Sequence, residues 1–305
     1  MRCNFMNKKI VCIGHATFDI TFPLKKFPEE NTKNRVKKIV QCGGGPASSA
    51  AYLLGKWKQK PYFIGTVGND IYGKTIKEEL KSVDVNIDYM EESDKYNTTL
   101  SIIIVSGSNS TRTSLAYKNP NMKMQNTNID IKPDILLTDG QEYELSMNVI
   151  KNNPDMISII DAGRATEEII ELCKNVNYIV CSKEFAEEVT GVKFNYRDAN
   201  TFNQIFIKLI EMFPNKKYVI TLEDKGSMFL DGEYVKIMPT YKMKVKDTTG
   251  AGDIFHGAFT YGIANGYSLE ESVKLGNIAG ALSTTKIGAR NSIPSLKDVM
   301  KLYEK

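Results

Sequence analysis

From about residue 130 onward, short β-rich runs alternate with helical patterns, and this alternation constrains the fold more than any other feature of the sequence. It is typical of βαβ units, in which parallel strands form a buried sheet covered by helices. The apolar runs expected to be strands of this sheet are 134–138, 156–160, 178–181 and 218–222. Between them, Thr166 and Ser182 are expected to cap helices and Gly191 to end one. The sequence therefore predicts an α/β fold with a central, mostly parallel sheet.

A long helix is expected between the last two of these runs, because apolar residues recur there at helical spacing. The residues on its buried face are expected to be Phe202, Ile205, Phe206, Leu209, Ile210 and Phe213. The pattern changes at 227–237, where Asp231-Gly232 separates two apolar runs. That dipeptide predicts a β-hairpin with a type I′ turn.

Two segments nearer the N-terminus, 21–41 and 98–117, interrupt the alternation. The second contains the turn-forming run Gly107-Ser108-Asn109-Ser110. Together they predict a small antiparallel β-sheet inserted into the α/β unit. Such a sheet would most usefully cover a ligand crevice at the carboxyl ends of the parallel strands.

The composition excludes several classes of protein. With 42% hydrophobic and 25% charged residues, the chain is not expected to be disordered, collagenous or built on disulfides. A net charge of +4 over 305 residues is too small to indicate a nucleic-acid-binding surface. The excess is local, because six basic residues lie between Lys25 and Lys38. This basic run is interpreted as a solvated face or as a surface that attracts an anionic small substrate.

The cysteines are odd in number and form no C-x-x-C pair; they are Cys3, Cys12, Cys42, Cys173 and Cys181. They indicate neither a disulfide framework nor a zinc site, and a reducing, cytoplasmic location is expected. No apolar run approaches the roughly 20 residues that span a bilayer. We therefore expect neither a membrane partner nor a signal peptide.

The most informative segment is DTTGAGDIFHGAF, from Asp247 to Phe259. Its residues Gly250, Ala251 and Gly252 are expected to open a helix. Such small residues leave backbone N–H groups unpaired and unshielded beside the positive end of the helix dipole. An anion is expected to bind there.

Asp253 would lie in the first turn of this helix and face whatever the amides hold. A carboxylate there would repel a phosphate, unless it accepts a proton from a neutral hydroxyl beside that phosphate. The motif therefore indicates phosphoryl transfer to an alcohol, with the amides neutralising charge on the transferring group. The alternative is that these residues only cap the helix.

A second glycine cluster, CGGGPASSAAYLLGKW, runs from Cys42 to Trp57 and opens another helix with Pro46 at its first position. Backbone without side chains permits close approach of a ligand, although a tight strand-to-helix turn would explain the same residues. The cluster does not match the dinucleotide-binding pattern G-x-G-x-x-G, because Ser48 stands where the third glycine belongs.

A competing match covers Gly68 to Thr75, which satisfies the P-loop pattern G-x-x-x-x-G-K-[ST] between a strand and a helix. A P-loop NTPase centred on Lys74 is therefore an alternative function. Asp70 argues against it, because its carboxylate would lie inside the nest of amides that must hold phosphates. The two histidines, His15 and His256, are interpreted as structural residues.

Three segments, DTTGAGD, GGGPASSAA and FIGTVGNDIYG, together resemble the ribokinase-like (phosphofructokinase B type) carbohydrate kinase family, and the resemblance covers essentially the whole chain. It implies a single domain over residues 1–305 with a three-layer α/β fold, and a small β lid at approximately 20–42 and 97–118. It also implies ATP-dependent phosphorylation of a hydroxyl group of a sugar or sugar derivative. The implied cofactors are ATP, Mg2+ and, in some members, K+. A homodimer that forms through the lid is expected by the same analogy.

The resemblance also assigns roles to individual residues. The catalytic group comprises the base, Asp253, and an anion hole formed by Gly250, Ala251 and Gly252. The positions expected to contact the sugar are Asp19, Gly44 and Gly45. Those expected to line the nucleotide site are Thr221, Gly226 and Asn277. Those expected to hold a monovalent cation are Asp247, Thr249, Gly288 and Ser292.

Arg112 and Arg164 are candidates for binding an anionic group on the substrate, because arginine forms bidentate contacts with phosphate and carboxylate. Together with the basic run they predict an acidic or phosphorylated sugar. The alternative is that both are ordinary surface arginines.

The sequence departs from the family pattern at three places. Ser48 or Ser49 replaces the asparagine that contacts the sugar. The usual N-x-x-E near the magnesium reads Ser182-Lys183-Glu184-Phe185, with Glu184 or Glu187 as stand-ins, and Glu223 replaces a glycine near the nucleotide. These changes leave open a third function, that of a sensor that binds a sugar or nucleotide without turnover.

Overall fold

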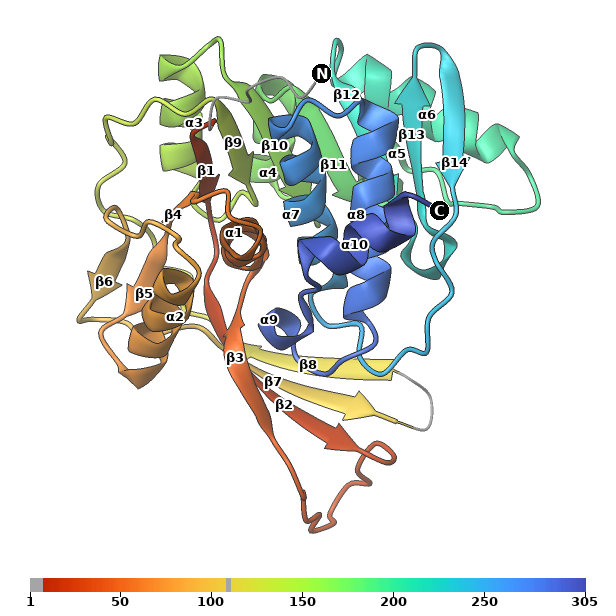
Figure 1. The fold of residues 1–305 in the computed structure, drawn as a ribbon. Helices are drawn as coiled ribbons and strands as arrows, with labels where there is room; N and C mark the ends of the chain where they lie inside the picture. Colours follow the sequence, from red (N-terminus) through yellow and green to blue (C-terminus); the bar gives the residue numbers. More distant parts are fainter. Residues whose placement is uncertain (1–7, 108–110) are drawn as a thin grey trace.

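A computed structural model describes residues 8–107 and 111–305. Its centre is an eight-stranded sheet with the strand order β14-β13-β12-β11-β10-β9-β1-β4 (Figure 1). The strands from β12 to β4 are parallel, and β13 and β14 are added antiparallel at one edge. The strand bounds are β1 Ile10–Ile13, β4 Tyr62–Ile64, β9 Ile135–Thr138, β10 Ile157–Ala162, β11 Tyr178–Ser182, β12 Lys217–Thr221, β13 Ser227–Asp231 and β14 Tyr234–Met238.

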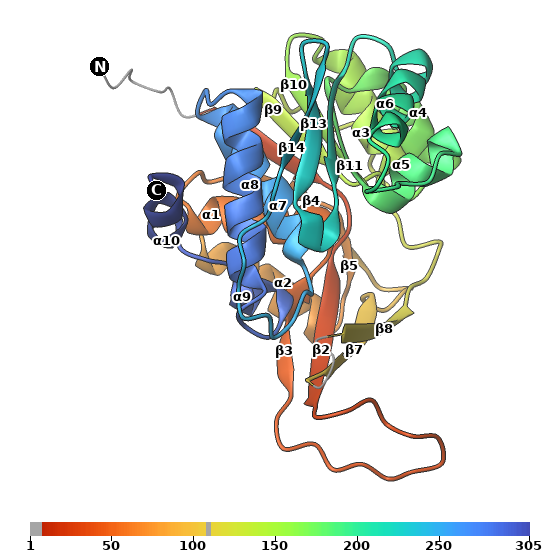
Figure 2. The same cartoon turned by 90° about the vertical axis from the view of Figure 1, so that its right-hand side faces the viewer.

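Helices cover both faces of this sheet, so that the molecule has three layers (Figure 2). One face carries α1 (Pro46–Lys56), α7 (Ala251–Ala264) and α8 (Leu269–Ser283), with α10 (Leu296–Tyr303) packed on α8. The other face carries α3 (Tyr143–Asn152), α4 (Glu167–Asn175), α5 (Lys183–Thr190) and α6 (Asn200–Met212). Phe255 and Phe259 of α7 pack with Val180 of β11 in one hydrophobic cluster. On the opposite face, Phe206 of α6 belongs to a cluster with Ile179.

A second, four-stranded sheet has the order β3-β2-β7-β8. Its strands are β2 Thr17–Leu24, β3 Val40–Gly44, β7 Leu100–Ser106 and β8 Thr111–Tyr117. Only residues 14–16 separate β1 from β2, so this sheet starts at the carboxyl end of a parallel strand. The sheet is mixed, because β2 and β7 are parallel neighbours, and the prediction of a purely antiparallel sheet is therefore wrong.

The remaining elements are two helices and a small separate sheet. Helix α2 (Ile71–Ser82) and the short α9 (Ala289–Ser292) both contact β3. Strands β5 (Thr66–Gly68) and β6 (Glu91–Ser93) form a separate two-stranded sheet.

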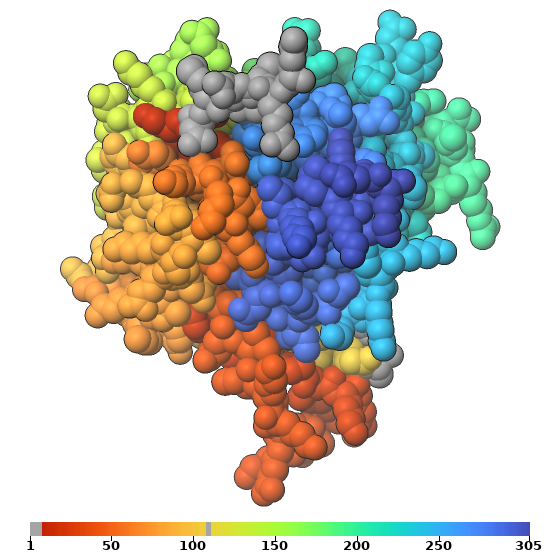
Figure 3. Space-filling model, viewed as in Figure 1, coloured from red at the N-terminus to blue at the C-terminus, as the bar shows by residue number. Residues whose placement is uncertain are grey.

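The connection between β2 and β3 carries the basic run and projects from the body of the molecule (Figure 3). All six of its basic side chains are exposed. Lys26 forms a surface ion pair with Glu29, with 2.6 Å between Nζ and Oε1. The structure therefore supports the interpretation of this run as a solvated face.

The four parallel strands predicted from apolar runs are found within two residues of the expected bounds. Thr166 and Ser182 cap α4 and α5 as expected, and Gly191 ends α5 with a left-handed φ of +67°. Ile210 was placed on the buried face of α6 and is instead 38% exposed. The face of α6 that packs on the sheet contains Leu209. Ile210 is the next residue, so its side chain points about 100° away around the helix axis.

The predicted hairpin is present, but its turn differs from the prediction. Asp231 and Tyr234 pair directly, so the two-residue loop consists of Gly232 and Glu233. Only Gly232 has a positive φ, +62°, whereas a type I′ turn needs positive φ at both positions. Of the other predicted turn, Ser108, Asn109 and Ser110 lie outside the described residues.

The cysteines within the described ranges, Cys12, Cys42, Cys173 and Cys181, are free and buried, and Cys3 lies outside those ranges. No helix in the part of the chain that the structure describes is long and apolar enough to cross a membrane.

Candidate active site

The N-terminus of α7 presents unpaired backbone amides. Gly250 precedes the helix with a left-handed φ of +74°, and no side chain caps this end. Among the described residues, none accepts a hydrogen bond from the amides of Gly252 and Asp253. A Cβ on Gly252 would meet no atom within 4 Å. The first turn of α7 is therefore open to an anion at the amides of Gly252 and Asp253. The amide of Ala251 donates to the carbonyl oxygen of Thr248 at 3.3 Å, and the anion hole at Gly250, Ala251 and Gly252 stays a prediction.

The carboxyl group of Asp253 points back toward this open end. Its Oδ2 lies 3.8 Å from the position that a Cβ on Gly250 would take. Burial raises the pKa of Asp253 to about 7, and the charge of Asp161 adds to this, while His256 and Arg112 oppose it. A half-buried carboxyl group with a pKa near neutrality is suited to accept a proton in the physiological range.

Arg112 connects the second sheet to this end of α7. Its Nη1 donates to Thr248 Oγ1 at 2.9 Å, and its charge lowers the pKa of Asp253. The guanidinium therefore contacts the segment just before α7, and the Arg112 side chain is exposed. Arg164, the other candidate, is exposed after β10, and no described carboxylate lies within ion-pairing distance of it.

Asp19 lies on β2 and is only 4% exposed. Burial raises the pKa of its carboxyl group to about 7, and the charge of Asp253 adds to this effect. Arg290 and a hydrogen bond with Ser101 act in the opposite direction. The carboxyl group of Asp19 is therefore within electrostatic range of Asp253.

The packing of the protein itself requires glycine at Gly44 and Gly45. A Cβ on Gly44 would lie 2.3 Å from Asp19 Oδ2, and a Cβ on Gly45 would lie 2.4 Å from the carbonyl oxygen of His15. Protein atoms therefore fill the space that the missing side chains leave, and that space is not open for a ligand. Contact between the backbone of these glycines and a sugar stays a prediction.

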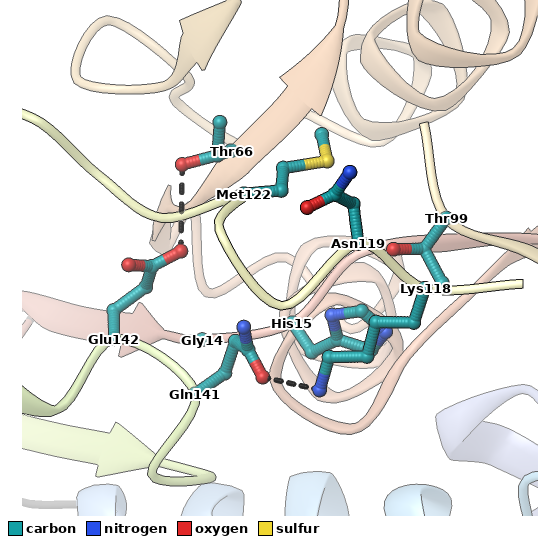
Figure 4. Close-up of a pocket in the computed structure, with 9 residues that line it drawn as sticks. All are labelled: Gly14, His15, Thr66, Thr99, Lys118, Asn119, Met122, Gln141 and Glu142. Carbon is teal, nitrogen blue, oxygen red and sulfur yellow. Dashed lines mark hydrogen bonds between the residues drawn. The ribbon is translucent and has the colours of Figure 1, made fainter. Parts of the chain in front are cut away.

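A polar pocket lies at the carboxyl ends of β1 and β9, where the chain leaves β8 (Figure 4). Lys118 Nζ donates to Gln141 Oε1 at 2.5 Å, and Thr66 Oγ1 donates to Glu142 Oε1 at 3.4 Å. Burial and the charge of Lys118 lower the pKa of His15 to about 3, so its ring is neutral. Burial raises the pKa of Glu142 to about 7. The sequence did not reveal this pocket, because its residues come from separate loops.

Arg290 is a buried cation beside the glycine turn after β3, and it is 2% exposed. Its Nη1 donates to Glu79 Oε2 at 2.7 Å, and the same oxygen accepts from the amide of Gly43 at 2.8 Å. Its Nη2 donates to the hydroxyl of Ser48, one of the two positions considered for the family's sugar-contacting asparagine. Glu79 and Arg290 are 211 residues apart, and no local pattern links them.

The three residues predicted to line the nucleotide site lie close together near β12, β13 and α8. Thr221 is paired in register with Ser227, whose hydroxyl lies 3.2 Å from Asn277 Oδ1. Asn277 Nδ2 donates to the carbonyl oxygen of Met238 at 3.2 Å, and a Cβ on Gly226 would lie 2.1 Å from that oxygen. Gly226 and Asn277 thus hold the β-hairpin in place, and their contact with a nucleotide stays a prediction.

Glu223, which replaces a family glycine, has a φ of +55°. This left-handed conformation favours glycine and costs other residues roughly 1–2 kcal/mol. The side chain is exposed, so its charge faces solvent.

The four residues predicted to hold a monovalent cation form one buried cluster. Asp247, 3% exposed, accepts from Thr249 Oγ1 at 2.6 Å and from the amide of Gly288 at 2.9 Å. The amide of Ser292 donates to the carbonyl oxygen of Gly288 at 3.0 Å. In the described ranges, no cationic side chain lies within 4 Å of the Asp247 carboxylate. A buried carboxylate with a hydroxyl beside it and no cationic partner fits a monovalent cation.

The segment Ser182–Phe185 does not fit the predicted magnesium contact. Ser182 Oγ accepts from the amide of Phe185 at 3.0 Å as a helix cap, and the Phe185 ring is fully buried in the core. Glu187 accepts from the amide of Phe194 at 2.8 Å, and Glu184 is exposed. No group of three or more His, Cys, Asp or Glu within residues 8–107 and 111–305 could hold a metal ion.

The P-loop interpretation is wrong. Asp70 caps α2, and its carboxylate accepts from the amide of Gly73, the amide of Thr98 and the hydroxyl of Thr98, each at 2.8 Å. The carboxylate occupies the nest of amides that would have to hold a phosphate. Lys74 is exposed on the outside of the helix.

Comparison with known proteins identifies the family. Residues 7–296 match the model of the pfkB family carbohydrate kinases. A ribokinase of Lactococcus lactis is 26% identical over 314 residues, covering 95% of each chain, and a nucleoside kinase of Methanocaldococcus jannaschii is 24% identical, covering 98% of this chain and 97% of the relative. The structure of Arabidopsis thaliana ribokinase complexed with ribose and ATP superposes with a TM-score of 0.82 at 24% identity, covering 98% of this chain and 100% of that one. The chain therefore belongs to the pfkB family of carbohydrate kinases, enzymes that phosphorylate a sugar with ATP as the donor.

Proposed function

We propose that Asp253 removes the proton from a sugar hydroxyl while the amides in the first turn of α7 hold the phosphoryl group that this hydroxyl attacks. The observation that carries the proposal is the carboxyl group of Asp253 beside amides that have no protein acceptor in the described chain. A bond forms between the hydroxyl oxygen and the terminal phosphorus of ATP, and the bond from that phosphorus to the bridging oxygen breaks to release ADP. The proton goes to Asp253, and the amides neutralise charge on the phosphoryl oxygens.

Asp19 is proposed to hold a second hydroxyl of the sugar, because it is a buried carboxyl group within electrostatic range of Asp253. Thr221, Gly226 and Asn277 are proposed to line the nucleotide side, where β12, β13 and α8 lie close together. Asp247 and its neighbours would hold K+, which would supply a fixed positive charge near the anion hole. Mg2+ is expected to accompany the phosphates of ATP, without a ligand from Ser182 or Phe185.

The second sheet is proposed to act as a lid. Arg112 on β8 contacts the residues before α7, so the sheet already covers part of the crevice. A cover of this kind excludes water from the transferring group and limits wasteful hydrolysis of ATP. A homodimer through this sheet and a cytoplasmic location stay predictions.

The proposed substrate class is a sugar or sugar derivative with an acidic or phosphorylated group. Arg112 supports it, because an exposed guanidinium over Thr248 can form a bidentate contact with an anion. A screen that couples ADP release to an optical signal, over neutral, acidic and phosphorylated sugars, tests this. We expect the highest kcat/KM for an anionic sugar, and a loss of about tenfold or more for that sugar in Arg112→Gln.

The matched control is Arg197→Gln, which removes an exposed arginine from the connection between α5 and α6 and should leave every rate unchanged. If a neutral sugar gives the highest kcat/KM and Arg112→Gln does not alter its ratio to the anionic sugars, the anionic assignment is refuted. The screen is run in potassium and in choline buffers, and a lower rate in choline is expected if Asp247 holds K+.

The raised pKa values predict a pH dependence. Both Asp253 and Asp19 have a pKa of about 7, and both act as acceptors in the proposed reaction, so both must be ionised. As the pH falls below about 7 they become protonated, and kcat/KM is expected to fall by about tenfold or more per pH unit. Steady-state rates between about pH 5.5 and 8.5 measure this. A profile that is flat down to pH 5.5 would show that neither carboxyl group has the proposed role.

A further inference from the structure

His256 is a buried residue that the proposed reaction does not use. It lies one turn after Asp253 in α7 and is 3% exposed. Its Nδ1 is 2.7 Å from the carbonyl oxygen of Gly252 and 3.2 Å from Asp161 Oδ2. Its Nε2 is 3.1 Å from the carbonyl oxygen of Val180. The ring thus joins the first turn of α7 to Asp161 of β10 and to the middle of β11.

These neighbours determine how many protons the ring carries. Backbone carbonyl oxygens only accept hydrogen bonds, and a neutral imidazole has one N–H and one bare nitrogen. In either neutral tautomer, the bare nitrogen would therefore face the carbonyl of Gly252 or of Val180 without a hydrogen between them. A bare ring nitrogen and a carbonyl oxygen are both acceptors, and placing them against each other in a buried site is costly. Only the imidazolium form donates from both nitrogens.

Asp161 supplies the negative charge that a buried imidazolium requires. Its carboxyl group is 14% exposed and lies at the end of β10. Burial raises the pKa of Asp161, and the charge of His256 opposes that effect. A protonated ring and an ionised Asp161 would form a buried ion pair, in which each partner compensates the desolvation of the other.

The contact with Gly252 connects this pair to the reacting centre. The carbonyl oxygen of Gly252 and the N–H of Asp253 belong to the same peptide unit, and that N–H has no protein acceptor in the described chain. A charged donor on the carbonyl side fixes the plane of the peptide and polarises it, which makes its N–H a stronger donor.

We propose that His256, held as an imidazolium by Asp161, is a positioning residue that fixes the Gly252–Asp253 peptide and directs its N–H at the transferring phosphoryl group. The inference rests on the anion hole proposed above. The inference adds a buried pair, His256 and Asp161, that supports the anion hole from behind its backbone.

A pair of amide variants tests the role in turnover. In His256→Asn the amide nitrogen can occupy the place of Nδ1 and still donate to Gly252, whereas in His256→Gln it reaches the place of Nε2 and leaves Gly252 without this donor. We expect His256→Gln to lower kcat by about 10- to 100-fold with both KM values within about twofold, and His256→Asn to retain kcat within about threefold. A purely structural role would reduce kcat equally in both variants, or in step with their melting temperatures, and either result would overturn the inference.

Ring 15N chemical shifts of the untagged protein test the charge state without any turnover. The chain has only two histidines, so comparison with His256→Asn assigns the signals, and the neutral His15 serves as the internal reference. We expect two protonated ring nitrogens for His256 near pH 7, and one in Asp161→Asn. A neutral His256 ring in the unsubstituted protein refutes the proposal.

The proposed reaction and the proposed role of His256 can be refuted independently of each other. If Asp253→Asn remains active, the proposed reaction is wrong whatever the ring nitrogens show. If Asp253→Asn is inactive while His256→Gln turns over like the unsubstituted protein, the reaction stands and only the positioning role of His256 is lost.

Discussion

Replacing Asp253 by asparagine is expected to lower kcat by about 10³-fold or more, while the affinity for ATP stays within a few fold. The amide keeps the size of the side chain but cannot take the proton of the attacking hydroxyl. The proposed anion hole is unaffected, because it consists of backbone N–H groups at the start of α7. Steady-state kinetics give kcat, and calorimetric titration with ATP gives the affinity separately.

A control variant and a stability measurement accompany this experiment. Lys74→Ala should change kcat by less than about twofold, because Lys74 is exposed on the outside of α2 and Asp70 fills the loop that resembles a P-loop.

Asp253→Asn should also stabilise the free protein by about 1–3 kcal/mol at pH 8 and not at pH 4. The sign follows from the raised pKa: the folded state binds the proton of Asp253 more tightly than the unfolded chain, and this stabilisation is lost as the pH rises through about 7. Inactivity accompanied by unfolding, or full activity, would contradict the assignment.

Glu79→Gln is expected to lower the free energy of unfolding by about 3 kcal/mol, although the new side chain has nearly the same shape. The reason is Arg290, whose guanidinium is buried and has Glu79 as its only ion-pair partner within the described chain. Its Nε already lacks a hydrogen-bond partner, so removal of the carboxylate leaves a buried cation largely uncompensated. Because Glu79 also accepts from Gly43, the KM for the sugar should rise as the glycine turn loosens. Chemical denaturation and steady-state kinetics measure the two effects.

The neighbouring Glu78 provides the matched control, since it is exposed on the same helix and Glu78→Gln should change stability by less than about 0.5 kcal/mol. Adding Arg290→Met to Glu79→Gln should recover part of the loss, because the unpaired charge is then removed as well. Equal stabilities of the Glu79 and Glu78 variants would show that the buried pair does not stabilise the fold.

The sequence predicted the features that depend on neighbouring residues. Buried parallel strands need contiguous apolar residues, and the runs around Ile135 and Val180 were found as strands for that reason. The open first turn of α7 follows from three small residues and an acid in succession, and Asp253 lies in that turn as predicted. Asp70 was likewise recognised as incompatible with a phosphate nest before its three donors were known.

Features that depend on packing between distant segments could not be predicted. The missing side chain of Gly44 is equally compatible with a ligand and with a protein atom, and only the fold shows that Asp19 fills the space. The partners of His256 and Arg290 come from strands and helices far away in the chain, and His256 was interpreted as no more than structural for lack of them. The parallel pairing of β2 with β7 also depends on a register that neither strand encodes alone.

The location of Asp19 on the smaller sheet, rather than on the main one, affects how the enzyme selects among acceptors. If the smaller sheet moves as a cover, Asp19, which is proposed to bind the sugar, moves with it. Sugar binding and closure of the site would then be one thermodynamic step. A molecule that fills the space without engaging Asp19 would contribute nothing toward closure. Selectivity among acceptors would then depend on the fraction of enzyme in the closed state as well as on binding affinity. A single water molecule would favour closure only weakly.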